Sequence, residues 1–185
     1  MYRLGKVQSA QLLVRRAPDS GLLRARADLI LADVMRSRGD YARAKEHALS
    51  VHAYAQGDGL IALWAQSLIS QARTCYAQGN LQDAVRLAAE AAQIAQDADY
   101  GLQYLDASIV GARSGDDSVD LTTILKLARA CGYGWALSAV LHLCAERHVQ
   151  RGEGAAALLC AEEALALREE MQDPKLANTR VVLKS

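Results

Sequence analysis

The histidines are the residues of this sequence with the most specific chemistry, and their spacing decides whether they can act together. There are four of them: His47, His52, His142 and His148. Two metal ligands on one helix face lie three or four residues apart, whereas the members of these two pairs are five and six residues apart. The sequence therefore predicts no metal site, and nothing else in it indicates a cofactor.

The four cysteines are the next candidates for chemistry. Cys75, Cys131, Cys144 and Cys160 include no Cys-x-x-Cys pair, and each lies in an apolar stretch with helical spacing. A free cysteine in such a place packs as a small hydrophobic residue, so we expect buried free thiols. Two alternatives stay open: a disulfide between Cys144 and Cys160, on helices expected to be neighbours, or a reactive thiol.

The short motifs of well-known enzyme classes are absent from the sequence. It contains no glycine-rich phosphate loop of the GxxxxGK(S/T) or GxGxxG kind, no GxSxG and no HExxH. The aspartates between positions 97 and 120 lack the alternating ligands and the closing glutamate of an EF-hand loop. We assign them to helix caps and solvated loops, and we expect that the protein is not an enzyme.

Helices must position whatever site exists, because the composition favours helix throughout. Alanine and leucine make up about a third of the 185 residues, and phenylalanine is absent. This argues against a β-sandwich or barrel, and 51% apolar residues argue against disorder. Since 21 basic residues balance 21 acidic ones, we expect no direct binding of nucleic acid or membranes. Without a signal-peptide or membrane-spanning stretch, a cytoplasmic location is expected.

Glycine-containing breaks interrupt the helical pattern at regular intervals. They fall at Gly39-Asp40, Gly79-Asn80, Gly115-Asp116 and Gly152-Glu153, with spacings of 40, 36 and 37 residues. Glycine ends a helix by taking the left-handed conformation, and the Asp or Asn after the first three glycines can cap the next helix. A second set of breaks follows each of these about 20 residues later.

The breaks predict about nine helices in an all-α fold. We expect helices over 4–16, 21–38, 41–56, 60–78, 81–97, 101–113, 118–131, 135–151 and 154–171, with a weak final helix over 175–183. Each helix carries an apolar stripe too wide for a single hairpin to bury. Stacking the hairpins side by side buries these stripes, which is the physical basis of a helical solenoid.

Small residues recur where the two helices of each hairpin would touch. They are Ala32, Ala44 and Val51 in the first unit, Ala72, Ala84 and Ala91 in the second, and Ala145, Ala157 and Ala164 in the fourth. Together with the loop Gly-Asp-Tyr-x-x-Ala at 39–44 and the ending Asp173-Pro174, this pattern resembles the tetratricopeptide repeat (TPR). The third unit departs from the pattern, because its sites hold Ser108, Asp120 and Leu127.

The resemblance implies a right-handed α-solenoid of antiparallel hairpins in one domain over 1–185. Its expected parts are a leading helix (1–19), repeats at 20–58, 59–98, 99–132 (degenerate) and 133–174, and a tail (175–185). The long units are similar to the degenerate repeats of large bacterial transcription activators of the maltose-regulator type. Such arrays belong to larger proteins, so the chain is expected to be a fragment of one or a stand-alone adaptor.

In the family that the pattern resembles, the first helix of each hairpin lines a concave groove. The groove positions map onto Arg26, Asp33, Arg36, Gln66, Arg73, Tyr76, Leu105, Ile109, His142 and Glu146. The resemblance thus implies a groove with a basic N-terminal end, able to bind carboxylates through its arginines, and with an apolar middle. Leu29 and Asp33 occupy positions that the family's chaperone-tail clamp needs for Lys and Asn, so binding of chaperone tails is not expected.

The first functional hypothesis is a non-catalytic protein–protein interaction module of a regulatory or signalling protein, with a protein or peptide as its partner. A second hypothesis is homo-oligomerisation, or contact with other domains of a longer chain, through the unpaired first helix and Val181–Leu183. A third is a small-molecule-sensing domain of a transcription regulator, with the ligand in an apolar groove around Leu105 and Ile109.

Overall fold

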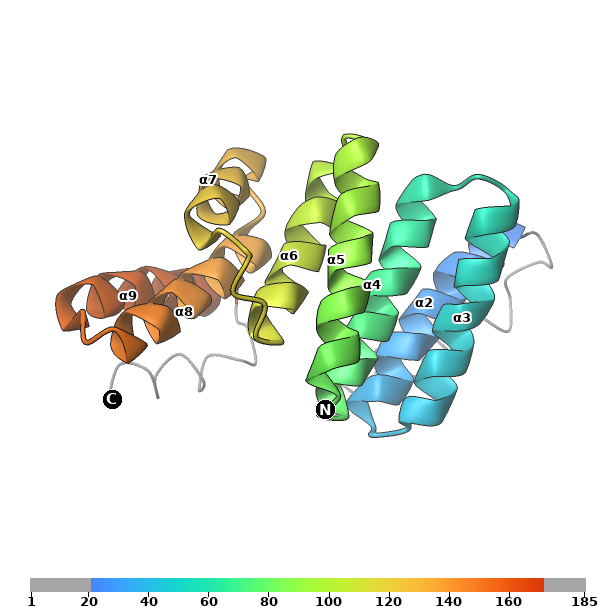
Figure 1. Ribbon diagram of the computed structural model, residues 1–185, viewed down its shortest axis with the longest axis horizontal. Coiled ribbons are helices and arrows are strands. Elements are labelled where there is room, and N and C mark those ends of the chain that lie inside the picture. Colours follow the sequence, from blue (N-terminus) through green and yellow to red (C-terminus); the bar gives the residue numbers. More distant parts are fainter. Residues whose placement is uncertain (1–20, 172–185) are drawn as a thin grey trace. The chain divides into compact units, whose positions relative to one another are not determined.

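The computed structural model describes residues 21–171, and this part of the chain consists of eight helices joined by short turns (Figure 1). The helices are α2 (Gly21–Ser37), α3 (Tyr41–Gly57), α4 (Ile61–Ala77), α5 (Leu81–Asp97), α6 (Gly101–Arg113), α7 (Leu121–Cys131), α8 (Gly134–Gln150) and α9 (Gly154–Glu170). Each element packs mainly on its neighbours in sequence. The predicted all-α fold and its solenoid-like packing are therefore confirmed, whereas the helices expected over 4–16 and 175–183 lie outside the described residues.

The four predicted glycine turns take the left-handed conformation. The φ angles of Gly39, Gly79, Gly115 and Gly152 are 81°, 80°, 95° and 74°, a region that costs a residue with a Cβ atom free energy. Each glycine therefore allows the chain to leave one helix and start the next within a few residues, as the sequence predicts.

Two of the three predicted helix caps are present, and the third lies elsewhere. Asp40 and Asn80 accept hydrogen bonds from backbone N–H groups in the first turns of α3 and α5. Asp116 does not cap a helix; its Oδ1 accepts from the backbone and hydroxyl of Ser118 instead. Helix α7 begins later than expected, and its N-cap is Asp120, which accepts from Thr122 N.

The small residues predicted at helix contacts are all buried. Ala32, Ala44, Val51, Ala72, Ala84, Ala91, Ala145, Ala157 and Ala164 are each 5% exposed or less. Alanine at these positions allows two helix backbones to approach closely, and larger residues fill the space on either side. The best-filled part of the core lies between α4 and α5, where Leu68, Ile69 and Leu87 pack with Ala107 and Val110 of α6.

The described part of the chain falls into two compact units, with the division between Ser114 and Gly115. The division falls inside the degenerate third repeat. Of the three residues at its small sites, Asp120 serves as a helix cap and Leu127 is only half-buried, so neither provides the buried alanine contact found in the other repeats. Helices α2–α6 belong to unit 1, and α7–α9 belong to unit 2.

Candidate partner-binding face

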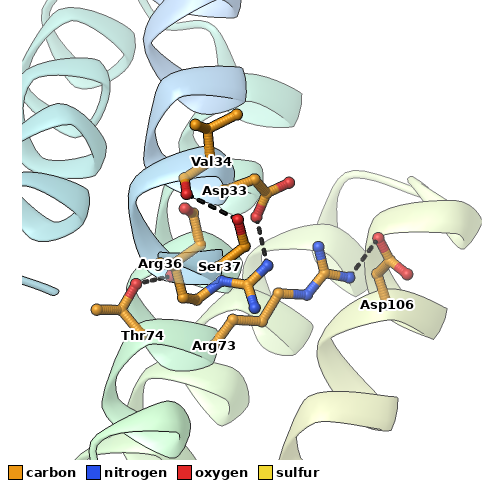
Figure 2. A network of polar contacts seen from close by, with 8 residues as sticks. Asp33, Val34, Arg36, Ser37, Arg73, Thr74 and Asp106 are labelled. Atoms are coloured by element: carbon orange, nitrogen blue, oxygen red, sulfur yellow. Dashed lines mark hydrogen bonds and ion pairs between the residues drawn. The ribbon is translucent and has the colours of Figure 1, made fainter. Parts of the chain in front are cut away.

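Three first helices of successive hairpins, α2, α4 and α6, lie side by side in unit 1. Charged residues from all three meet on the face that they form, which we call the α2/α4/α6 face. Arg36 Nη2 donates a hydrogen bond of 2.7 Å to Asp33 Oδ1, and Arg73 Nη2 lies 3.2 Å from Asp106 Oδ2. Figure 2 shows both arginine side chains reaching into the space between Asp33 and Asp106.

Local helix geometry fixes these side chains. Arg36 stands in the last turn of α2, where a cation interacts favourably with the helix dipole, and Asp33 lies one turn before it on the same side. The neighbouring hydroxyls bond to their own helices: Ser37 Oγ donates to Val34 O at 2.8 Å, and Thr74 Oγ1 donates to Ser70 O at 2.9 Å. These two hydroxyls therefore do not serve as donors to the carboxylates of the network.

The face is only partly accessible to water, so its charged groups interact more strongly with one another than they would in full solvent. The side chains of Arg73 and Asp106 are 25% and 29% exposed. Burial is the main reason why the pKa of Asp106 is raised, and the charge of Asp33 adds to this effect, whereas Arg73 and Arg113 oppose it. Arg73 thus holds a carboxylate in surroundings that disfavour its charge.

Two polar atoms of this network are buried without a hydrogen-bond partner within the described part of the chain. They are Arg36 Nε, a donor, and Asp106 Oδ1, an acceptor. Leaving such atoms unpaired costs free energy. Both atoms are buried, so this cost falls on the network itself.

Three further residues of the predicted groove extend the α2/α4/α6 face. Arg26, Gln66 and Tyr76 are exposed on α2 and α4, Tyr76 by 45%. Arg26 is seven residues from Asp33 and Tyr76 is three from Arg73, so helical periodicity places each on the same side as its charged neighbour. The structure therefore groups the predicted residues of the first two repeats on one side of unit 1.

The predicted apolar middle of the groove is wrong. Leu105 and Ile109 are buried, with exposed fractions of 0% and 1%, so neither lines an accessible surface. Asp106, the residue next to Leu105, reaches the face instead and pairs with Arg73. The mapping from the intact repeats is thus shifted by one position in α6, the first helix of the degenerate repeat.

The last two predicted groove residues belong to unit 2. His142 and Glu146 stand one turn apart on α8, with His142 Nε2 3.3 Å from Glu146 Oε1. Neither is among the residues of α2, α4 and α6 that form the face of unit 1.

Sequence reasoning missed two residues of this face. Asp106 was assigned with the other aspartates to caps and loops, although it lies 33 residues after Arg73, close to one repeat length. Ile30, between Arg26 and Asp33 on α2, is 45% exposed. Ile30 thus adds exposed apolar surface next to the charged groups. The sequence did not indicate this, because α2 has many apolar residues and Ile30 could not be told apart from those in its core.

Within residues 21–171, no group of three or more His, Cys, Asp and Glu side chains is arranged to hold a metal ion. No helix in that same range is both long and apolar enough to span a membrane. No protein-family model matches the chain, and no curated protein gives a significant match. The case for a function therefore depends on the geometry of the α2/α4/α6 face.

Proposed function

We propose that the chain is a non-catalytic protein-interaction module whose α2/α4/α6 face binds an acidic segment of a peptide or partner protein. The observation that carries the proposal is the pairing of Arg36–Asp33 and Arg73–Asp106 across three adjacent helices. Both arginine side chains are partly exposed, at 28% and 25%. A guanidinium has five N–H donors in a fixed plane, so one guanidinium can donate to more than one carboxylate.

The surroundings of the network suit a partner of mixed chemistry. Tyr76 and Ile30 offer exposed apolar surface on the two sides of the arginines. The segment that fits best therefore carries a carboxylate flanked by an apolar side chain.

The same proposal takes the hairpins as TPR-like repeats of a regulatory protein. Its support is the burial of all nine small sites and the left-handed glycine in every first-to-second-helix turn. The four cysteines are free thiols, the state that a reducing compartment such as the cytoplasm maintains.

The decisive variant is Arg36→Glu with Arg73→Glu, tested on peptides selected against the wild-type protein from a random display library. We expect the selected peptides to be acidic and to lose at least about tenfold in affinity, since two charge-assisted hydrogen bonds are removed and repulsion is added. The affinities are measured by fluorescence anisotropy, and circular dichroism verifies that the variant is folded.

The chain offers a closely matched control in Arg43→Glu with Arg86→Glu. Arg43 and Arg86 lie on the second helices α3 and α5, and each is also paired with an aspartate three residues earlier. This variant makes the same change of net charge and keeps the α2/α4/α6 face intact, so affinity should change less than about twofold. Equal losses in both variants would show only a general charge effect, and the proposal would be wrong.

Self-association remains a second candidate because α9 of unit 2 exposes two adjacent leucines. Leu158 and Leu159 are 48% and 68% exposed. If they form an interface between copies of the chain, light scattering on the wild type will show a dimer that Leu159→Glu converts to monomer. For the small-molecule hypothesis, Leu105 and Ile109 are buried and do not form an exposed apolar surface.

A further inference from the structure

Unit 2 contains a cavity of about 400 Å³ that is separate from the residues of the α2/α4/α6 face. Its walls come from the turn before α7 and from α7, α8 and α9, and two cysteines are among them, Cys144 of α8 and Cys160 of α9. Both are free thiols; Cys144 is buried and Cys160 is partly exposed. A small molecule in this cavity would therefore meet two thiols at once.

The hairpin of α8 and α9 places the two cysteines at the same distance from its turn, and both line the cavity. The turn that joins these antiparallel neighbours is centred on Gly152, and Cys144 lies eight residues before it while Cys160 lies eight after it. Burial first, and the nearby Cys160 second, raise the pKa of Cys144 to about 11. The influence of Cys160 on this pKa is consistent with their shared position on the cavity wall.

We propose that Cys144 and Cys160 form a redox-active dithiol, which closes to a disulfide across the α8–α9 hairpin by exchange with a small-molecule disulfide admitted through the cavity. Neither the cavity nor the pair belongs to the partner-binding face. The proposal therefore stands whether or not that face binds a peptide.

The reaction consists of two exchange steps. The more exposed Cys160 loses its proton to solvent, and its thiolate attacks one sulfur of the small disulfide. That S–S bond breaks, one small thiolate leaves, and a mixed disulfide forms. The thiolate of Cys144 then attacks Sγ of Cys160 and expels the second small thiolate. Two protein thiols are oxidised, the small disulfide is reduced to two thiols, and solvent protons balance the products.

Electrostatics set the expected rate. The pKa values of both thiols are raised, mainly by burial; Glu163 adds to the effect at Cys160, and Arg129 opposes it at both. The charged or titratable groups near the pair or lining the cavity are Asp117, Asp120, Arg129, Arg147, His148, Arg151 and Glu163. Since only the thiolate attacks, the exchange should be slow at neutral pH and gain about tenfold per pH unit below the thiol pKa.

The test uses the full chain with oxidised glutathione as the small disulfide, followed over a range of pH by intact mass after alkylation. We expect the loss of two hydrogens from Cys144 and Cys160 with no glutathione retained on either, a cross-linked peptide joining these two residues, and rates that rise with pH. Oxidation should also raise the midpoint of thermal unfolding by several degrees, because the bond closes a loop of the unfolded chain. Reduction should restore the original mass and midpoint.

Three variants make the outcome decisive. Cys131→Ser removes an exposed cysteine outside the pair and should leave the reaction unchanged. Cys144→Ser should stop the reaction at a stable mixed disulfide on Cys160, whereas Cys160→Ser should abolish it. A stable glutathione adduct on Cys144 or Cys160 of the wild-type chain, a disulfide that joins either of them to Cys75 or Cys131, or no change in Cys160→Ser would each overturn the proposal. Failure here leaves the peptide-binding test unaffected.

Discussion

The ion pair between Arg73 and Asp106 should have a larger coupling free energy than an ordinary surface pair. Its atoms are 3.2 Å apart and its side chains are 25% and 29% exposed. Coulomb's law at this distance gives about 5 kcal/mol for an effective dielectric constant of about 20, and about 1 kcal/mol in water. Both side chains remain partly exposed and solvent screens their attraction, so we expect a coupling of about 1–2 kcal/mol.

A double-mutant cycle with Arg73→Met and Asp106→Asn measures this coupling directly. Arg73→Met alone should be the most destabilising member, since it leaves a sheltered carboxylate without its cation. Adding Asp106→Asn should recover part of the loss. The free energies of unfolding are obtained from urea titrations at neutral pH, followed by circular dichroism.

The pair Arg86–Asp83 supplies the reference cycle. Its atoms are 3.6 Å apart and its side chains are 63% and 48% exposed, so its coupling should be about 0.3–0.5 kcal/mol. If the two cycles give the same small coupling, the reasoning about the sheltered α2/α4/α6 face is refuted.

Three further changes have defined outcomes. Burial raises the folded-state pKa of Asp106 above its ordinary 3.8, so the ionised form of Asp106 disfavours folding. The free energy of unfolding of the wild type should therefore fall, relative to that of Asp106→Asn, as the pH rises from about 4 to 7. Urea titrations of both proteins at each pH measure this difference. Leu68→Ala, at a side chain 2% exposed in the α4–α5 core, should cost about 2–5 kcal/mol of unfolding free energy by urea titration. Asn80→Ala, which removes the cap on Asp83 N, should cost about 1 kcal/mol, seen as a lower unfolding midpoint by calorimetry.

Much of the fold could be predicted from the sequence because its signals are local. A glycine that must take positive φ, such as Gly39, marks a turn by itself. An alanine such as Ala84 recurs at repeat spacing because two backbones meet there. These signals require no knowledge of distant contacts, and the helix ends that they predict differ from the observed ones by a residue or so in most cases.

The rest depends on contacts that the repeat pattern does not encode. In the degenerate third unit, Asp120 caps α7 instead of packing in the hairpin, and the chain divides there into two units. In α6, Asp106 rather than the predicted Leu105 reaches the α2/α4/α6 face. A pairing between residues 33 apart on different helices follows only from the packed structure.

The most direct test of the account is NMR of the arginine side chains during titration with a selected acidic peptide. The account predicts that the Nε–H signals of Arg36 and Arg73 shift with the same dissociation constant as the bound peptide, because the guanidinium groups contact its carboxylate. The signals of Arg43 and Arg86, on the second helices, should stay in place. Saturable binding that leaves the signals of Arg36 and Arg73 unmoved would contradict the central claim.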